Sequence, residues 1–299
     1  MLDTKKPDNN FINSLYIENF RNHQTLEINT KKSYVVIWGK NGVGKTSILE
    51  ALSIFSNGKG LRNSKLVEMI NVDENKFCIA INIQIEKNIV LELKSTYCKN
   101  EKVRKVYING KENKNLGKLK NSFPMLWITP YDEKVFRGSP SSRRTFLDRL
   151  IDNFDSDHSR RIASYNTLIQ QRAKVLKGNH DDNEWLTVIE DQLSKLAVSI
   201  CSSRLDIVSR ISNYLNLGFD GIPKLRIEFF ESIENELLKK PAIEIEDELK
   251  IKFHDSRKLD MLMGGSLHGS HKTDFFCYNI EKNIPANSCS SGEQKLLLI

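Results

Sequence analysis

The stretch VVIWGKNGVGKTSILEAL limits the possible folds of this chain more than any other part of its sequence. Its centre satisfies the pattern G-x-x-x-x-G-K-[ST], with the apolar run YVVIW before it and the helix-forming run TSILEAL after it. When a glycine-rich loop connects a strand to a helix, the N–H groups of the loop point at one anion. The positive end of the helix dipole points at the same anion. The spacing therefore predicts an α/β domain with a phosphate site.

The residue types of this loop fit a bound nucleotide. Glycines let the loop curl around the β- and γ-phosphates, the lysine adds a positive charge, and the threonine hydroxyl is a ligand for Mg²⁺. The chain has no D-x-x-G motif, and NKNL at residues 113–116 lacks the aspartate that reads guanine, so ATP is predicted. The predicted ATP-binding residues are Gly39, Lys40, Asn41, Gly42, Val43, Gly44, Lys45 and Thr46, with Thr46 also the predicted Mg²⁺ ligand.

The rest of the chain divides into a β-rich part, a helical part and a mixed part. Short apolar runs at residues 13–20, 24–29, 33–39 and 76–97 predict strands, and Asn109-Gly110 predicts a tight hairpin turn. Apolar residues recur at helical spacing from residue 185 to 215, after a first helix at 158–176 that ends near Gly178. These helices predict an antiparallel hairpin, which either packs on itself or also offers a partner surface. The predicted divisions are 1–130, 131–220 and 221–299.

Charge and cysteine usage narrow the class of protein. Lys and Arg total 45 against 38 for Asp and Glu, and the net charge of +7 favours an anionic partner such as nucleic acid. The five cysteines form no C-x-x-C pair, which argues against a zinc ribbon or a disulfide framework and fits a reducing compartment. No signal-peptide core and no run of about 18 apolar residues are present, so a cytoplasmic protein without membrane contact is predicted.

Six stretches, in this order, resemble the RecF family of bacterial DNA replication and repair ATPases. They are LYIENFRNHQTLEI, the glycine-rich loop, NGKGLR, WITPYDEKVFRGSPSSRRTFLDRLI, HGSHKTDF and SSGEQKLLLI, and they span essentially the whole chain. The resemblance implies an ABC/SMC-like P-loop ATPase head with a β-rich N-terminal part and an inserted helical lobe. It also implies ATP-dependent dimerisation on single-stranded or gapped DNA, gap repair, recombinase loading and the SOS response, with RecO and RecR as partners.

The resemblance gives the segment SSGEQK a role. In ABC-type ATPases this signature lies at a helix N-terminus and contacts the γ-phosphate that the P-loop of the other protomer holds. Carried over, Ser290 donates its hydroxyl, Gly292 donates its N–H, and Glu293 begins the helix. ATP would then join a symmetric dimer, and ADP, which lacks the γ-phosphate, would release it.

Two stretches depart from the family pattern. Lys59 stands where the family generally has arginine in G-R-x-[FL]-R, although Arg62 is retained. HGSHKTDF replaces G-P-H-R-D-D-L, with Lys272 in place of arginine and Thr273 in place of aspartate. A lysine keeps the charge but loses the planar fork of arginine, so phosphate contacts at these positions are expected to be weaker.

Some side chains allow two interpretations. Arg62, Arg143 and Arg144 are possible DNA or phosphate contacts, but the latter two also fit a solvated helix end paired with Asp148 and Asp152. His268 and His271 lie three residues apart without a nearby cysteine, which argues against zinc. Trp127 and Tyr131 could stack on a base, although core packing is the favoured interpretation.

An ABC-type ATPase also needs an apolar strand that ends in Asp-Glu. TVIED falls within the predicted long helix and LRIEFFES lacks the aspartate, whereas RecF proteins have this strand after the signature helix. We therefore expect no catalytic residue in this chain, which would contact ATP through Lys45 and Thr46 without useful hydrolysis. The favoured interpretation is a RecF-type protein represented by an incomplete chain. The alternatives are an ABC-type ATPase subunit of another system, such as a transporter, and a truncated product without activity.

Overall fold

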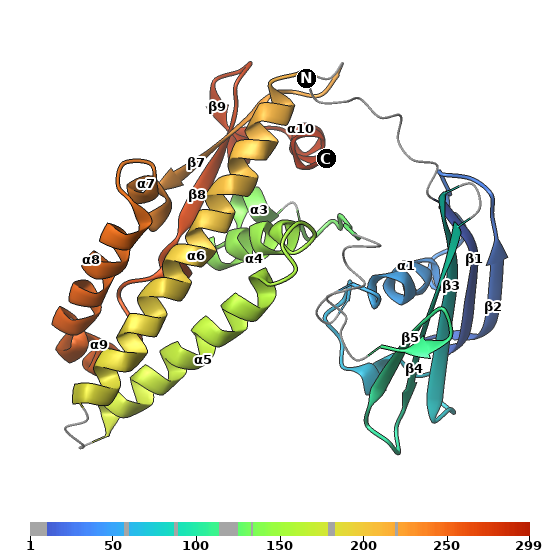
Figure 1. Cartoon of the computed structure of the whole chain (residues 1–299). Coiled ribbons are helices and arrows are strands. Elements are labelled where there is room, and N and C mark those ends of the chain that lie inside the picture. Colours follow the sequence, from blue (N-terminus) through green and yellow to red (C-terminus); the bar gives the residue numbers. More distant parts are fainter. Residues whose placement is uncertain are drawn as a thin grey trace. The chain divides into compact units, whose positions relative to one another are not determined.

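The computed structural model describes residues 11–56, 60–86, 89–113, 125–132, 134–178, 183–218 and 221–299 (Figure 1). The chain forms two compact units, residues 1–127 and 128–299. The first boundary lies close to the predicted one at residue 130. Residues 221–299 pack within the second unit, and the predicted division at residue 220 stays a prediction.

The first unit contains a six-stranded antiparallel sheet in the order β2-β1-β3-β4-β5-β6. Asn109 and Gly110 form the turn between β5 and β6 with φ angles of 48° and 75°, as their sequence predicts. The strands are β1 Phe11–Phe20, β2 His23–Asn29, β3 Lys76–Glu86, β4 Ile89–Cys98, β5 Arg104–Ile108 and β6 Lys111–Glu112. The single turn of 3₁₀-helix η1 spans Leu66–Met69.

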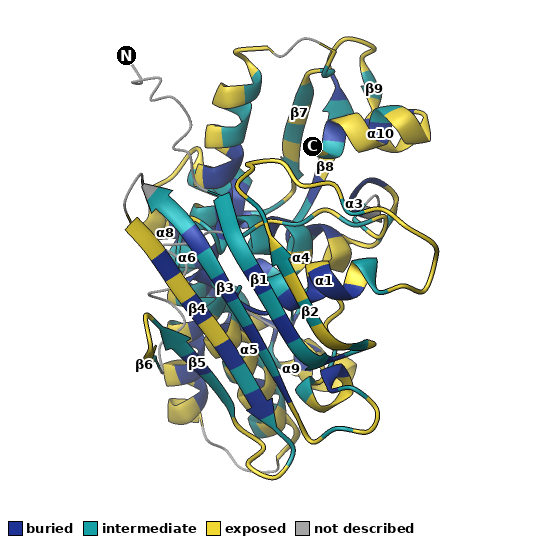
Figure 2. Ribbon diagram, turned by 90° about the vertical axis from the view of Figure 1, so that its right-hand side faces the viewer, coloured by how far each residue is buried: buried dark blue, intermediate teal, exposed yellow. Residues whose placement is uncertain are grey.

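One face of this sheet carries the core of the first unit. Apolar residues at alternate positions of β1, β3 and β4 point to the same side, where helix α1 (Lys45–Ser53) packs against them. Buried and more exposed residues therefore alternate along the strands in Figure 2. Phe20 and Phe77 meet edge to face in this core, with ring centroids 5.3 Å apart. The sheet and α1 together position the glycine-rich loop.

The predicted strand at residues 33–39 is wrong. This segment has no regular secondary structure, and Tyr34, Val36 and Trp38 are 93%, 84% and 88% exposed. Ile37 is the residue that packs against the core. A strand needs a hydrogen-bonded neighbour, and none of the strands in the described ranges pairs with this segment. The apolar run therefore predicted neither the pairing nor, except at Ile37, the burial of its side chains.

The second unit is mainly helical, with a small sheet. Helices α5 and α6 form the predicted hairpin, although its turn at residues 179–182 lies outside the described residues. A three-stranded antiparallel sheet in the order β7-β8-β9 lies beside α6. The elements are α3 Lys134–Arg137, α4 Pro140–Ile151, α5 His158–Lys177, α6 Asn183–Leu215, β7 Leu225–Phe230, α7 Ile233–Leu237, α8 Ala242–Asp255, α9 Arg257–Met263, η2 Ser270–Lys272, β8 Asp274–Asn279, β9 Ile284–Pro285, η3 Ala286–Ser288 and α10 Ser291–Leu298.

Two apolar clusters and several buried ion pairs hold the second unit together. One cluster lies between β8, α4 and the C-terminal part of α6, and the other lies between α5, α6 and α8. Arg172 of α5 is 1% exposed and contacts the carboxylates of Glu190 on α6 and Asp260 on α9. In the part of the chain that the structure describes, no helix is both long and apolar enough to cross a membrane.

Candidate functional site

The glycine-rich loop leads directly into the N-terminus of α1. Gly44 is the N-cap residue with a φ of 98°, and no side chain caps the first turn. The first N–H groups of a helix have no partner within the helix, so this end of α1 is suited to bind an anion. The Nζ atom of Lys45 lies 2.7 Å from the carbonyl oxygens of both Gly39 and Lys40. The loop therefore places a full positive charge and free N–H groups together.

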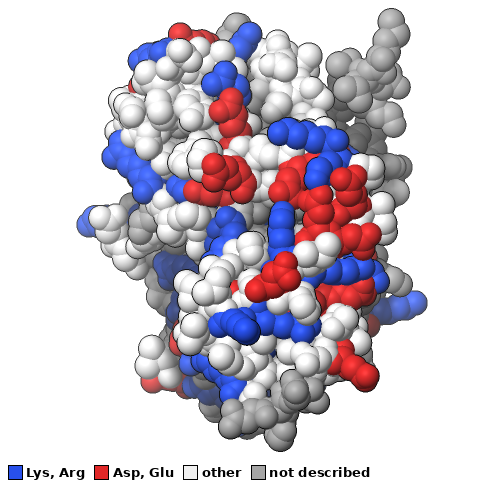
Figure 3. All heavy atoms as spheres, turned by 90° about the vertical axis from the view of Figure 1, so that its left-hand side faces the viewer, with Lys and Arg blue, Asp and Glu red and all other residues white. Residues whose placement is uncertain are grey.

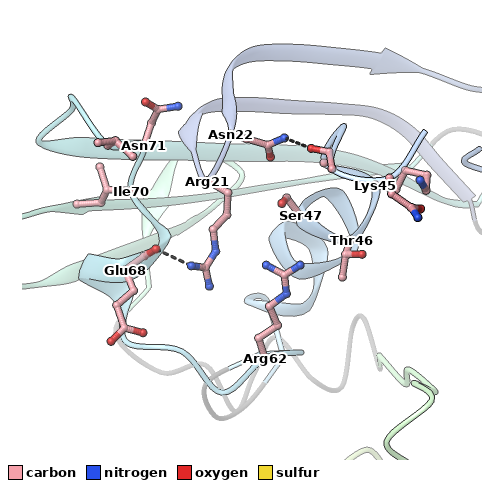
Figure 4. Close-up of a pocket in the computed structure, with 13 residues that line it drawn as sticks. Arg21, Asn22, Lys45, Thr46, Ser47, Arg62, Glu68, Ile70 and Asn71 are labelled. Atoms are coloured by element: carbon pink, nitrogen blue, oxygen red, sulfur yellow. Dashed lines mark hydrogen bonds between the residues drawn. The ribbon is translucent and has the colours of Figure 1, made fainter. Parts of the chain in front are cut away.

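A cavity of about 600 Å³ opens beside this loop (Figure 4). Its walls come from the β1–β2 turn, the loop with the first turn of α1, and the segment that includes η1. The cavity is therefore lined by parts of the chain that lie up to about 50 residues apart in sequence. Its size suits a ligand larger than a phosphate group. The lining residues are Arg21, Asn22, Asn41, Gly42, Gly44, Lys45, Thr46, Ser47, Arg62, Glu68, Ile70, Asn71 and Val72.

The cavity has an excess of positive charge. Glu50 of α1 is fully buried, and its carboxylate accepts hydrogen bonds from Nε and Nη2 of Arg21 at 3.0 Å and 2.6 Å. Arg62 approaches the same carboxylate at 3.3 Å while its side chain stays 43% exposed. One buried carboxylate thus faces two guanidinium groups, and Lys45 adds a third cation. This balance favours an anionic ligand.

Gly44 offers a test of how tightly the loop is packed. A Cβ atom at this position would lie 2.3 Å from Nε2 of His23 and 2.7 Å from Oδ1 of Asn22. Gly42 has a similar φ of 85°, but a Cβ atom there meets nothing within 4 Å. We expect Gly42→Ala to lower the free energy of unfolding by about 1 kcal/mol and Gly44→Ala by roughly 2–3 kcal/mol. Urea unfolding of both variants checks this, and equal losses would contradict the close contact.

The signature segment lies at a helix N-terminus, but α10 begins at Ser291, two residues before the predicted start at Glu293. Ser290 is the N-cap residue; its Oγ atom accepts a hydrogen bond from the N–H of Glu293 at 3.4 Å. In return, the N–H and the hydroxyl of Ser290 each donate to the carboxylate of Glu293 at 3.0 Å. Ser290 and Gly292 are exposed, and a Cβ atom at Gly292 would meet nothing within 4 Å. The structure thus presents these residues at an exposed helix N-terminus that Ser290 and Glu293 cap, and their contact with a nucleotide stays a prediction.

Gln294 supports this segment, a role that the sequence did not reveal. Its side chain is buried, and Nε2 lies within hydrogen-bonding distance of the carbonyl oxygens of Ala286, Asn287 and Cys289, at 3.0 Å, 3.2 Å and 3.0 Å. These carbonyls belong to η3 and the residue after it, which lead into Ser290. Gln294 therefore holds the chain that delivers Ser290 to the start of α10. The sequence signal that could have revealed this role is a polar residue, Gln294, among apolar residues on the buried face of a short helix.

The carboxylate of Glu293 is unusually acidic. An ion pair with Lys282, together with the hydrogen bonds from Ser290, lowers its pKa from 4.5 to about 2. A depressed pKa means that the stabilising contact is complete above the ordinary pKa and is lost as the pH falls toward 2. We expect an NMR titration of Glu293 to show a midpoint near 2 and Lys282→Ala to raise it. A midpoint near 4.5 in the native chain would contradict this geometry.

Arg143, at the start of α4, forms a buried contact rather than a solvated one. Its Nε and Nη2 atoms donate to the two carboxylate oxygens of Asp274 on β8, at 2.6 Å and 2.7 Å. Arg144 donates to the carbonyl oxygen of Thr273 at 2.7 Å. The predicted pairing of these arginines with nearby aspartates is therefore wrong, because the fold brings β8 beside α4. A DNA contact for them stays a prediction, and the burial of Arg143 leaves that side chain little room for one.

The two aspartates have other partners. Asp148 accepts two hydrogen bonds from Arg204 at 2.8 Å and 2.9 Å, and Asp152 accepts one from the N–H of Ser159 at 3.1 Å. Both contacts join α4 to later helices rather than to the arginines of its own first turn.

Thr273 also has a structural explanation. It is 2% exposed, and its hydroxyl lies 3.1 Å from both carboxylate oxygens of the fully buried Glu234. An aspartate at this position would place a second carboxylate against the first, which is unfavourable in a buried site. Lys59, in the other stretch that departs from the family pattern, lies outside the described residues.

The weaker predictions have mixed outcomes. Both ring nitrogens of His271 are occupied, by the hydroxyl of Tyr165 at 2.8 Å and the carbonyl of Ser266 at 3.0 Å. Across the described ranges no group of histidine, cysteine and acidic residues could hold a metal ion. Tyr131 is 75% exposed, so its predicted core packing is wrong, whereas Trp127 is half-buried.

Comparison with known protein families gives a match over most of the chain. The model of the AAA ATPase domain family matches residues 11–195. Among curated proteins, the DNA replication and repair protein RecF of Rickettsia prowazekii (strain Madrid E) is 34% identical over 294 residues, which cover 97% of this chain and 80% of that protein. RecF of Rickettsia bellii (strain OSU 85-389) is 33% identical with the same coverage. RecF of Rickettsia typhi (strain ATCC VR-144 / Wilmington) is 32% identical over 291 residues.

Solved structures agree in fold. The recombination mediator protein RecF-ATPrS in the RecFOR pathway aligns with a TM-score of 0.84 and 22% identity, and covers 97% of this chain and 79% of that one. The RecF-ATP structure of the same pathway aligns with a TM-score of 0.83 and 21% identity. These alignments confirm the predicted ABC/SMC-like P-loop ATPase fold, with its β-rich first part and its helical lobe.

Proposed function

This chain belongs to the RecF family of DNA replication and repair proteins, and we propose that it binds ATP and pairs with a second copy of itself on DNA. One observation carries the proposal. The uncapped N-terminus of α1, with Lys45 at its first position, opens into a cavity that has more cationic than anionic side chains. Such a site is complementary to a polyphosphate.

The cavity suggests how ATP would lie. The β- and γ-phosphates would occupy the glycine-rich loop, and Lys45 would exchange its two backbone carbonyls for phosphate oxygens. Thr46, next along α1, would supply its hydroxyl to Mg²⁺. The adenosine would extend toward Ile70 and Val72, which form the apolar part of the lining. Arg62, which is only partly engaged by Glu50, would turn toward the phosphates.

We propose binding rather than rapid turnover as the activity of these residues. Glu68 is the acidic residue among those that line the described cavity, and its carboxylate accepts a hydrogen bond from the N–H of Lys65 at 3.2 Å. A general base must reach an attacking water molecule beside the γ-phosphate. Glu68 lies on the side of the cavity away from the loop, beyond Arg21 (Figure 4).

The second half of the ATP site would come from the partner. Ser290 and Gly292 lie exposed at the N-terminus of α10, a position that suits a γ-phosphate presented by another copy. Because each copy would offer both a glycine-rich loop and a signature, two equivalent sites would form in a symmetric dimer. ADP lacks the group that the signature contacts, so it would not hold the dimer together.

An arginine in place of Ser290 tests this pairing. We expect Ser290→Arg to bind ATP with unchanged affinity but to remain a monomer in sedimentation experiments with a non-hydrolysable ATP analogue, because its bulk blocks the open helix end. Ser209→Arg, on an exposed position of α6, is the control and should dimerise like the native chain. Loss of nucleotide binding in Ser290→Arg, or dimerisation of it, would count against a shared site.

The dimer would bind DNA and the RecO and RecR proteins of the pathway. It would act in the cytoplasm. Exposed arginines are the candidates for contacts with the DNA phosphates. One of them is Arg160, whose side chain is 74% exposed. Such contacts are insensitive to sequence and weaken as salt rises. Filter binding of a gapped duplex at two salt concentrations measures this contribution.

A further inference from the structure

Helix α9 exposes its apolar face. Leu259, Leu262 and Met263 follow the i, i+3, i+4 spacing of one helix face, and they are 55%, 78% and 69% exposed. Asp260 lies about 100° around the helix from Leu259, on the side that faces the lobe, and is 2% exposed. An amphipathic helix on a protein surface ordinarily has the reverse arrangement, with its apolar stripe toward the core. The exposed stripe, Leu259, Leu262 and Met263, is called the α9 stripe below.

Asp260 fixes this orientation. Its carboxylate accepts hydrogen bonds from Arg172 at 2.6 Å, from the hydroxyl of Ser256 at 2.7 Å and from the N–H of Leu267 at 2.8 Å. A rotation that buried the stripe would break all three contacts and leave Arg172 without one of its carboxylates, which is far more costly than exposing three apolar side chains. The α9 stripe is therefore held in solvent by the fold itself.

Three lysines without ion pairs lie on α9 and on the last turn of the adjacent helix α5. Lys174 and Lys177 lie in the last turn of α5, against which α9 packs, and Lys258 lies on α9. The Nζ atom of Lys177 would lie 3.4 Å from a Cβ atom at Gly264, at the end of the stripe. All three lysines are exposed, and none pairs with a carboxylate of the described residues.

The neighbouring helix differs in this respect. Lys240, Lys250 and Lys252, on α8 or just before it, all form ion pairs, and acidic and basic groups interleave on the face shown in Figure 3. These three lysines are therefore neutralised by their own carboxylates, whereas the three lysines beside the α9 stripe are not.

We propose that the α9 stripe is a docking site for an acidic amphipathic helix of a partner protein. The apolar face of that helix would cover Leu259, Leu262 and Met263, and carboxylates on its flanks would pair with the three lysines. Seven residues make α9 about 10 Å long, which matches two turns of a partner helix. Methionine at the end of the stripe allows the fit to adapt to the partner's side chains.

Charge decides between this occupant and the others. A second copy docking on the same stripe would bring three lysines against three lysines, which disfavours self-association. An anionic bilayer extends far beyond the stripe and would meet the exposed carboxylates of Glu244 and Asp247 on the adjacent α8. A single acidic helix meets the lysines and avoids α8.

The test uses the full chain and two fluorescein-labelled peptides of equal length. One is an amphipathic helix with leucine on one face and glutamate elsewhere, and in the other every glutamate is lysine. We expect fluorescence anisotropy to show at least ~10-fold tighter binding of the acidic peptide, a difference of about 1.4 kcal/mol. Leu262→Asp should weaken that binding at least ~10-fold. Lys174→Glu, Lys177→Glu and Lys258→Glu combined should invert the preference in favour of the basic peptide.

A matched control separates docking from folding. Ile243→Asp changes an apolar side chain on α8 that is 65% exposed, and it should leave acidic-peptide binding unchanged. Circular dichroism of each variant verifies the fold. Equal affinity for both peptides, or an unchanged preference after the charge reversal, would overturn the proposal. A dimer of the native chain that Leu262→Asp dissociates would also overturn it. The same holds if the chain does not bind the acidic peptide but sediments with phosphatidylserine vesicles, and Leu262→Asp abolishes that sedimentation.

Discussion

Replacing Lys45 with alanine should weaken ATP binding by at least about 100-fold, or about 2.7 kcal/mol. In the loop, the Nζ atom of Lys45 lies 2.7 Å from two backbone carbonyls, and it would move from them to the β- and γ-phosphates. Alanine removes the full charge nearest to those phosphates, and the helix N-terminus supplies only a partial one. Isothermal titration calorimetry with ATP measures the change directly.

Lys40→Ala is the matched control. Lys40 is an exposed lysine of the same loop, but its position in the pattern is variable, and it contributes its carbonyl rather than its side chain to the Lys45 contact. We expect its ATP affinity to stay within about 3-fold of the native value. Lys40→Ala should unfold at the same urea concentration as the native chain, because the Lys40 side chain is exposed. If Lys45→Ala bound ATP as tightly as the native chain, the glycine-rich loop could not be the nucleotide site.

Replacing Arg172 with methionine should destabilise the second unit by about 3–5 kcal/mol. Arg172 is 1% exposed and joins three elements, with bonds of 2.8 Å to Glu190, 2.6 Å to Asp260 and 2.6 Å to the carbonyl of Phe253. Methionine fills a similar volume but leaves two buried carboxylates with less compensation and one buried carbonyl unpaired. The loss therefore reflects uncompensated charge rather than a cavity.

Urea unfolding followed by the fluorescence of Trp185 in α6 reports on this unit when Trp38 and Trp127 are replaced by phenylalanine. Arg210→Met is the control, because Arg210 is 64% exposed and its ion pair with Asp206 spans one turn of α6. A surface pair of this kind contributes about 0.3–0.5 kcal/mol. If Arg172→Met costs no more than Arg210→Met, the buried ion pairs do not hold the helical lobe together.

Local patterns predicted the parts of this protein that depend on local chemistry. The glycine-rich loop and α1 follow from residue types within one short stretch, where the left-handed angles at Gly42 and Gly44 need glycine. The strands β1 to β4 follow from short apolar runs, and the hairpin turn after β5 follows from Asn109-Gly110. The α5–α6 hairpin follows from helical spacing over more than 50 residues.

Local sequence patterns could not predict the contacts between residues that lie far apart in the chain. Arg143 pairs with Asp274, 131 positions away, although two aspartates lie within its own helix region. The run at residues 33–39 looks like a strand, yet pairing depends on a neighbour that its own residues do not specify. The contacts of Arg21 and Arg62 with Glu50 likewise join three separate segments around the cavity. The composition of the site was predictable, whereas its charge balance needed the fold.

A mixing experiment tests the central claim, that ATP joins the glycine-rich loop of one copy to the signature of another. Lys45→Ala and Ser290→Arg chains should each remain monomers in sedimentation velocity runs with a non-hydrolysable ATP analogue. Mixed together, they can build one intact site from the loop of the Ser290→Arg chain and the signature of the Lys45→Ala chain. We expect a heterodimer with the ATP analogue and none with ADP. A mixture that sediments as monomers under both conditions, or a native chain that dimerises equally well with ADP, would contradict the account.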